Sequence, residues 1–160
     1  MITIHCMSVS VNLETVQPRR LAAVRREIAP AALGSAWKPA LDTVWHFLRG
    51  RPGDLWAGGH NIFLYHHPAH AGAPLLCEFG VEVTTTFEPE GEVYPTSTPA
   101  GEAAVAHHRG PYDLMREAHS AIEVWMAANS RESPEFSWEI YGDPTPDPAD
   151  TETTVVYLLK

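Results

Sequence analysis

The sequence has few cysteines and little positive charge. Cys6 and Cys77 are its only cysteines, too few for a disulfide scaffold, so two reduced thiols are the simpler interpretation and a single bridge stays open. The chain has eleven lysines and arginines and twenty aspartates and glutamates, which gives a formal net charge of −9. Because this balance disfavours a phosphate-binding surface, we expect a neutral or cationic ligand and no direct nucleic-acid partner.

Long apolar runs and targeting features are also missing. No apolar stretch approaches the ~20 residues that a membrane helix needs, and residues 1–16 lack the basic start of a signal peptide. The sequence therefore predicts a soluble, cytoplasmic protein without a membrane partner. It contains no Walker loop, no dinucleotide-binding glycine motif and no Gly-x-Ser-x-Gly motif, so we expect no cofactor.

The nine histidines raise the question of a metal site. His66, His67 and His70 lie close together, while His107 and His108 are neighbours on an expected strand and would point to opposite faces. Zinc sites normally combine histidines with cysteines or carboxylates at helical or loop spacing. Neither a Cys-x-x-Cys nor a His-Glu-x-x-His motif occurs, so we predict no metal.

What remains is the composition of a folded domain. The chain has 160 residues, of which 44% are hydrophobic, enough for one domain with a sizeable core. Alternating and helical patterns of apolar residues are cut by prolines and glycines. Trp45 and Trp125 are predicted to be core residues, and Leu114 to lie on the buried stripe of the second helix. The patterns predict helices at 35–49 and 112–129, and strands at 12–17, 19–26, 61–66, 75–86, 93–96, 101–109, 136–141 and 153–159.

The order of these elements repeats, and so do parts of the sequence. Ala22-Ala23-Val24 resembles Ala103-Ala104-Val105, and each helix carries a tryptophan at a corresponding place. We interpret this as a duplication, although the matches are few and coincidence stays open. The predicted fold is α+β, a single domain of residues 1–160 with two tandem antiparallel modules, at about 12–83 and 93–159. Each module reads strand, strand, helix, strand, strand. A pseudo-two-fold axis would relate the modules, both helices would lie on one side of the sheet, and the axis would hold a ligand cleft.

One predicted strand carries an unusual pair of side chains. In Trp138-Glu139-Ile140-Tyr141, alternation places Glu139 and Tyr141 on the face opposite Trp138 and Ile140. Gly142, Asp143 and Pro144 then end the strand. A carboxylate is costly to bury without a partner, so Glu139 faces either water or a cavity that receives a polar or cationic molecule. We favour the cavity.

Four segments resemble the GyrI-like small-molecule-binding domain: His108-Arg109-Gly110-Pro111-Tyr112, residues 118–125, Trp138 to Pro144, and residues 154–159. This domain also forms the effector-binding part of some AraC- and MerR-type regulators. The resemblance implies paired SHS2-type modules with a ligand cleft between them. It also implies that Glu139, on the strand after the second helix, receives cationic drugs among aromatic rings. No stretch of the chain is predicted to form a helix-turn-helix, so we expect an isolated binding or detoxifying domain for drug or natural-product resistance in a bacterium.

The resemblance leaves three functions open. In the first, Glu139 binds an aromatic cation. The other predicted ligand-binding residues are Tyr141, Tyr112, Trp37, Phe63 and Tyr65, which would form the cleft walls, and His108, which belongs to the first of the four segments. In the second, which is similar to some stand-alone members, the chain hydrolyses the cyclopropane of DNA-alkylating natural products. Glu139 would then be the general base, and Tyr141 or Tyr112 would bind the carbonyl. The third function is a protein-interaction module such as a gyrase modulator.

Overall fold

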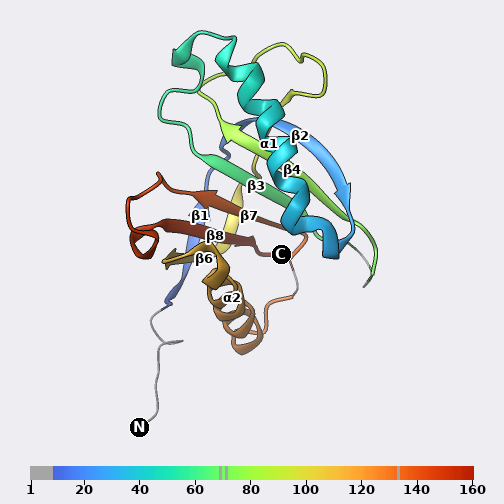
Figure 1. The fold of residues 1–160 in the computed structure, drawn as a ribbon. Helices are drawn as coiled ribbons and strands as arrows, with labels where there is room; N and C mark the ends of the chain where they lie inside the picture. The colour runs from blue at the N-terminus through green and yellow to red at the C-terminus, as the bar shows by residue number, and fades with distance from the viewer. Residues whose placement is uncertain (1–8, 69, 71, 133) are drawn as a thin grey trace.

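The structure is a computed structural model that describes residues 9–160 except 69, 71 and 133. Its helices are α1 (Leu33–Arg49) and α2 (Arg116–Ala128), and its strands are β1 (Val11–Val16), β2 (Arg20–Ile28), β3 (Asn61–His66), β4 (Leu75–Glu82), β5 (Tyr94–Ser97), β6 (Gly101–Arg109), β7 (Phe136–Tyr141) and β8 (Glu152–Leu158). The strands form one eight-stranded sheet in the order β1-β6-β8-β7-β3-β4-β2-β5 (Figure 1). Every neighbouring pair is antiparallel.

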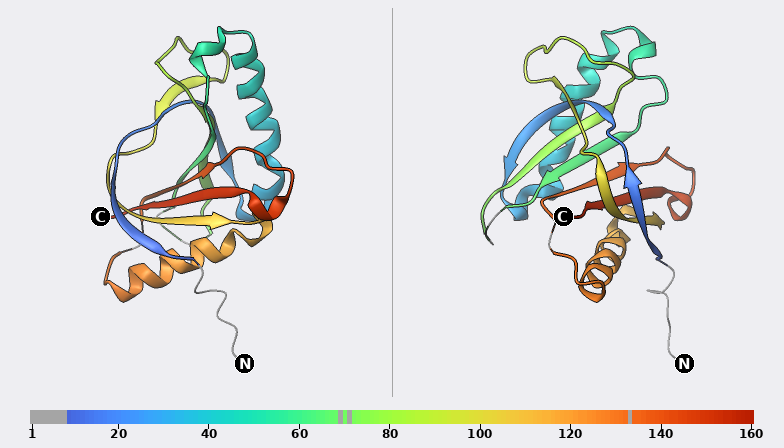
Figure 2. Two further views of the ribbon diagram at one scale, coloured as in Figure 1. Left: turned by 90° about the vertical axis from the view of Figure 1, so that its left-hand side faces the viewer. Right: turned by 180° about the vertical axis from the view of Figure 1, so that it is seen from behind.

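Both helices cover the same face of the sheet. α1 packs Val44 and Leu48 on β2 and β4, and α2 packs Ala118 and Ile122 on β6 and β8. The sheet curves away from the helices (Figure 2). On its other face, side chains of β2 and β6 therefore meet in a third core cluster, although these strands are not neighbours in the sheet. The members of this cluster are Leu21, Ala23, Ile62, Leu64, Ala103, Val105, Trp138 and Val156.

The two halves of the sheet follow the same order from the centre outward. At the centre, β3 pairs with β7, and Phe63 lies opposite Glu139. Phe63 also pairs with Phe79 on β4, just as Glu139 pairs with Val155 on β8. The outermost strands are exchanged between the halves, since β1 pairs with β6 and β5 pairs with β2. The duplication and the module limits 12–83 and 93–159 stay predictions.

The predicted α+β class is confirmed, with an antiparallel sheet and both helices on one side, but some boundaries differ. The strand expected to reach Thr86 ends at Glu82, because the backbone N–H of Thr84 donates to the Leu55 carbonyl instead of to a strand. The helix expected from Tyr112 begins at Arg116, because Tyr112–Leu114 form a 3₁₀ turn. Its tighter winding takes Leu114 off the buried stripe, and this side chain is 46% exposed.

Two tryptophans and one cysteine noted in the sequence lie in or beside the cores. Trp45 and Trp125 are half-buried at the edges of the cores under α1 and α2. Cys77 is buried under α1, whereas Cys6 lies outside the described residues. Within the described part of the chain, no helix combines the length and the apolar character needed to cross a membrane.

Candidate functional site

Glu139 is a buried carboxylate at the centre of the helix-covered face. Its residue is only 5% exposed, and its strand neighbours Trp138 and Ile140 contribute to the core on the other face. This is the alternation that the sequence predicts. Phe63 and Val155 flank it on β3 and β8. Because a buried charge is costly without partners, its hydrogen bonds decide what it can do.

Three side chains hydrogen-bond to this carboxylate. The hydroxyls of Tyr65 and Tyr141 donate to Oε1 at 2.7 and 2.6 Å. On the other oxygen, Nε2 of His119 lies 2.7 Å from Oε2 and is the donor if Glu139 is ionised. Nδ1 of His119 lies 2.8 Å from the hydroxyl of Tyr157. Glu139 is thus contacted by three polar side chains from three elements, so both of its oxygens have hydrogen-bond partners.

The tyrosines around Glu139 stay protonated. Burial is the main cause that raises the pKa of Tyr65 and of Tyr141, and the charge of Glu139 raises both further. Burial also raises the pKa of Tyr157, followed by the charges of Glu123 and Glu139. At neutral pH these hydroxyls therefore act as neutral hydrogen-bond donors.

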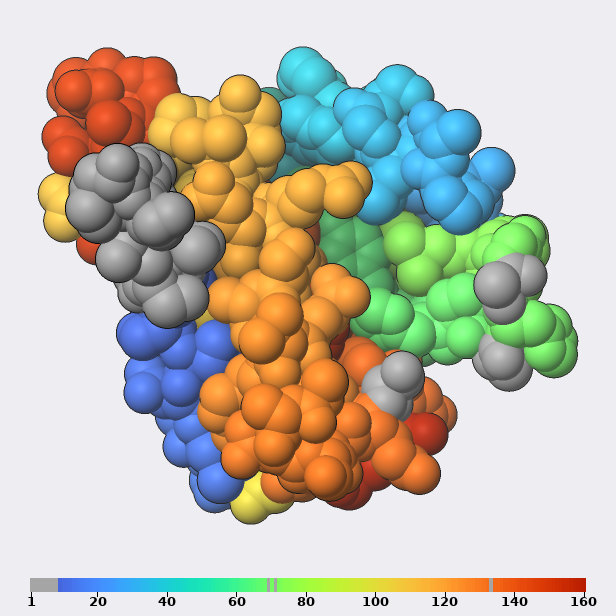
Figure 3. Space-filling model, turned by 90° about the horizontal axis from the view of Figure 1, so that it is seen from below, coloured from blue at the N-terminus to red at the C-terminus, as the bar shows by residue number. Residues whose placement is uncertain are grey.

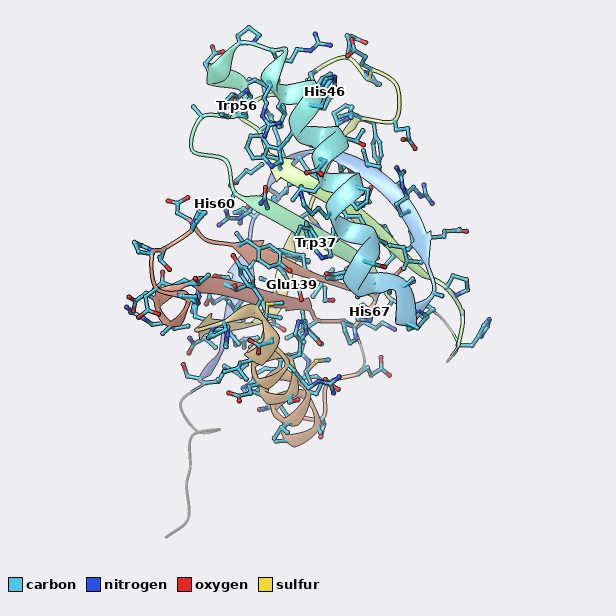
Figure 4. All side chains as sticks on the ribbon, viewed as in Figure 1. Trp37, His46, Trp56, His60, His67 and Glu139 are labelled. Carbon is cyan, nitrogen blue, oxygen red and sulfur yellow. The ribbon has the colours of Figure 1, made fainter. Side chains whose placement is uncertain are left out.

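Beside Glu139 lies a cavity of about 440 Å³, which we call the helix-face cavity. It opens between α1, the turn that precedes α2, and strands β3 and β7; Figure 4 shows Trp37 on α1 and Glu139 on β7 next to each other. Seen from below, α1 and α2 stand on either side of a recessed part of β3 (Figure 3). The lining residues are Leu33, Gly34, Trp37, Leu41, Asn61, Phe63, Tyr65, Tyr112, Met115, Glu139, Tyr141, Gly142 and Pro144.

Aromatic rings make up much of the wall. The ring centroids of Phe63 and Tyr141 are 4.9 Å apart, and those of Trp37 and Phe63 are 6.0 Å apart. Tyr112 lies edge-on to Tyr141, at 5.5 Å, and is largely exposed, so it stands at the rim. Such a surface suits a flat or multi-ring molecule, and its π-faces attract cations.

The end of β7 is shaped by Gly142. A Cβ atom there would lie 2.8 Å from the Glu152 carbonyl oxygen, to which the Gly142 N–H donates at 2.8 Å. Only glycine permits this close approach of β7 and β8. The chain then turns away, so that Gly142 and Pro144 complete the wall of the helix-face cavity.

Most of the residues predicted for the site come together. Glu139, Tyr141, Tyr112, Trp37, Phe63 and Tyr65 all line the helix-face cavity. His108 is the exception, because it is buried, is not among the lining residues, and has its Nε2 3.0 Å from the Pro111 carbonyl oxygen. That hydrogen bond fixes the turn before Tyr112, so the prediction of His108 as a ligand-binding residue does not fit its placement.

Two members of the hydrogen-bonded group were not predicted. His119 is one turn after Met115 on α2, and Tyr157 alternates with Val155 and Thr153 on β8. The sequence does carry a signal, since a histidine beside the apolar stripe of Ala118 and Ile122 needs a polar partner once the helix is buried. Its partner Glu139 could not be inferred without the packing of α2 on the sheet.

A second cavity, of about 680 Å³, lies on the other face. We call it the opposite-face cavity; its floor includes Trp138 and Ile140, and its rim includes charged side chains such as Glu14, Arg19 and Asp143. It is larger, but it holds no buried carboxylate and only one aromatic ring besides histidine among its described lining residues. The helix-face cavity is the better candidate site, because it joins an apolar wall to a few convergent polar groups.

Three other histidines are engaged in separate contacts. His66 bonds to Glu78 at 2.9 Å, His67 to the Ser137 hydroxyl at 2.6 Å, and His107 to the Thr154 hydroxyl at 3.0 Å. In the described ranges, no three or more histidine, cysteine, aspartate or glutamate side chains gather so as to hold a metal ion.

The chain belongs to the GyrI-like small molecule binding domain family, whose model matches residues 10–159. A search of curated protein sequences found no match.

Several solved structures share the fold. The EcmrR C-terminal domain has 20% sequence identity and a TM-score of 0.76, and the match covers 95% of this chain and 98% of that one. The same fold occurs in EcmrR bound to DNA, with 21% identity and a TM-score of 0.77 over 96% of this chain. There this chain spans only 58% of the relative's length.

Of two more distant structures, one is a complex with a small molecule and the other is a hydrolase. SAV2435 bound to tetraphenylphosphonium has 11% identity and a TM-score of 0.69, with 94% of each chain covered. A hydrolase encoded by lin2189 from Listeria innocua has 12% identity and a TM-score of 0.58, with 94% of this chain and 92% of that chain covered. At these identities the likeness shows the fold alone.

Proposed function

We propose that this domain binds a small aromatic cation in the helix-face cavity, with Glu139 as the receptor of the positive charge. The observation that carries the proposal is a buried carboxylate beside an aromatic cavity. Among the described residues that line this cavity, none is a lysine or an arginine. In the described part of the chain no lysine or arginine forms an ion pair with Glu139, so a ligand cation would supply a counter-charge to the carboxylate.

The size and chemistry of the cavity support the same ligand class. A volume of about 440 Å³ falls in the range of sites for drug-sized molecules. Trp37, Phe63 and Tyr112 offer ring faces that would contact an aromatic ligand, and desolvation would strengthen both the cation–π and the carboxylate attraction. Capture of such molecules would serve resistance to a drug or a natural product, or its sensing.

Binding is favoured over hydrolysis by the use of the carboxylate oxygens. A general base must direct a lone pair at water, but Oε1 of Glu139 already accepts from Tyr65 and Tyr141, and Oε2 lies against His119. The Tyr141 hydroxyl is likewise engaged by Glu139. An ionised carboxylate held in this way can still attract a cation. For proton abstraction, these hydrogen bonds would have to be rearranged.

The test is a titration with tetraphenylphosphonium, followed by tryptophan fluorescence, on wild type and Glu139→Gln. We expect the substitution to weaken binding about 10- to 100-fold, since charge-assisted contacts contribute about 1.5–3 kcal/mol. Equal affinity in the two proteins would contradict the role of Glu139. Absence of binding, together with turnover of a cyclopropane-bearing alkylator, would instead favour the hydrolase.

The chain offers a matched control. Glu78 is also a buried carboxylate bonded to a tyrosine, Tyr94, and to a histidine, His66, but it points away from the helix-face cavity. Glu78→Gln removes the same charge from a similar environment, so its tetraphenylphosphonium affinity should stay within about twofold of wild type. A similar loss in both variants would point to net charge or to stability, not to a receptor.

A further inference from the structure

His119 reaches Glu139 from outside the helix-face cavity. It lies on α2, its backbone N–H donates to the Met115 carbonyl, and its side chain is 23% exposed. It is not among the residues that line the cavity, whereas Glu139 is. The carboxylate thus has two sides: Oε1 with Tyr65 and Tyr141, both lining residues, and Oε2 with His119.

The groups that face His119 differ in whether they can carry positive charge. Glu139 on β7 lies 2.7 Å from Nε2, and Tyr157 on β8 lies 2.8 Å from Nδ1. At longer range, His67, which follows β3, is coupled electrostatically to His119, and Glu123, on α2 itself, acts on Tyr157. Tyrosine is neutral when protonated, so His119 is the group in hydrogen-bond contact with Glu139 that becomes a cation on protonation, within the described part of the chain.

We propose that His119 determines whether the cavity selects cationic or neutral aromatic molecules, by supplying or withholding a counter-charge to Glu139. The inference rests on the proposed receptor role of Glu139. When His119 is protonated, it forms an ion pair with the carboxylate, and the cavity receives neutral aromatic ligands. When His119 is neutral, its N–H still holds the carboxylate in place, and the charge is available to a cation. His119 is in this sense a positioning residue that acts through Glu139.

The sign of the coupling follows from linkage. A cation beside Glu139 disfavours a second positive charge on His119, so cation binding releases a proton, and protonation weakens cation binding by the same factor. Histidine is the side chain that changes its charge between about pH 5 and 8. Cation affinity should therefore rise with pH across this range, by about 5- to 150-fold if the coupling is of ordinary size.

The experiment measures the affinity for tetraphenylphosphonium and for a neutral analogue, triphenylphosphine oxide, at about pH 8 and about pH 5.5. In wild type, the cation should bind at least about fivefold more tightly at the higher pH, whereas the neutral analogue should change little or bind better at the lower pH. His119→Gln keeps an amide donor in place of Nε2–H but cannot take up a proton. This variant should bind the cation equally at both pH values. His107→Gln, as the control, removes a histidine that lines the opposite-face cavity, and it should retain the wild-type dependence.

Calorimetry gives a second readout that needs no variant. Titration in two buffers of different ionisation enthalpy reports the protons released, and wild type should release part of a proton per bound cation within the range of about pH 5 to 8. Glu139-dependent binding without proton release, or a pH dependence that persists in His119→Gln, would overturn this inference. Affinity that does not depend on Glu139 at either pH would instead overturn the receptor proposal, so the two failures can be told apart.

Discussion

The two halves of the sheet place different chemistry at corresponding positions. On the first half, Phe63 pairs with Phe79 under α1, inside an apolar cluster. On the second half, the corresponding pair is Glu139 and Val155, and α2 contributes His119 to a polar group. The comparison teaches that the same place in the strand order can hold an aromatic pair in one half of the sheet and a buried carboxylate with a polar network in the other.

The largest expected effect concerns the stability contributed by the first half. Phe79 is completely buried, and Phe79→Ala should lower the free energy of unfolding by about 3–5 kcal/mol. Val155, at the corresponding position of β8, is also completely buried, but Val155→Ala removes fewer carbon atoms and should cost roughly 1–2 kcal/mol. Urea unfolding of both variants measures the difference. Equal losses would show that the two halves contribute alike.

The next effect concerns the hydroxyls that hold Glu139. Tyr65→Phe and Tyr141→Phe each remove one hydrogen bond to the buried carboxylate, and each should destabilise the fold by about 1.5–3 kcal/mol at neutral pH. Tyr112→Phe is the control, because Tyr112 is 52% exposed, and its unfolding free energy should stay within about 0.5 kcal/mol of wild type. If the three variants unfolded alike, the bonds to Glu139 would not be important for stability.

Alkaline pH should lower the stability of the fold through the same two tyrosines. Their pKa values are raised in the folded protein, by burial and by Glu139, whereas an unfolded tyrosine ionises near pH ~10. The unfolded state therefore binds fewer protons above that pH, so their contribution is complete below pH ~10 and falls as the pH rises. Each tyrosine should account for about 1.4 kcal/mol per pH unit. Tyr65→Phe and Tyr141→Phe should each flatten the decline by one proton; a slope equal to that of wild type would contradict this.

The smallest effect is expected for charges on the surface. Lys38 and Asp42 form an exposed pair one turn apart on α1. Asp42→Asn should change the free energy of unfolding by only about 0.3–0.5 kcal/mol, and tetraphenylphosphonium affinity by less than about twofold. It removes one negative charge, as Glu139→Gln does, but at a hydrated site. A large loss of cation affinity in Asp42→Asn would mean that the overall charge of the protein, and not the buried carboxylate, attracts the ligand.

Much of the fold could be predicted because its strands are short apolar or alternating runs bounded by turn residues. Asn61–His66 and Phe136–Tyr141 were predicted with the observed bounds, because the first is a short apolar run and the second alternates between apolar and polar residues. The 3₁₀ turn at Tyr112–Leu114 was missed, because local sequence does not separate a 3₁₀ turn from the first turn of an α-helix.

The site could be predicted in part, for a different reason. Glu139 and Tyr141 stand out because a carboxylate and a phenol share one face of an otherwise apolar strand. His119 and Tyr157 do not stand out, because their roles depend on how α2 lies on β7 and β8. His108 lies outside the cavity lining, because the motif that contains it shapes a turn. The pattern of a single sequence does not show which distant segments contact each other.

The most direct test of the central claim is an experimental structure of the domain with tetraphenylphosphonium bound. The account predicts the ligand in the helix-face cavity, with its phenyl rings against Trp37 and Phe63 and its phosphorus within about 6 Å of the Glu139 carboxylate. A ligand seated in the opposite-face cavity, or one bound with its charge turned away from Glu139, would contradict it.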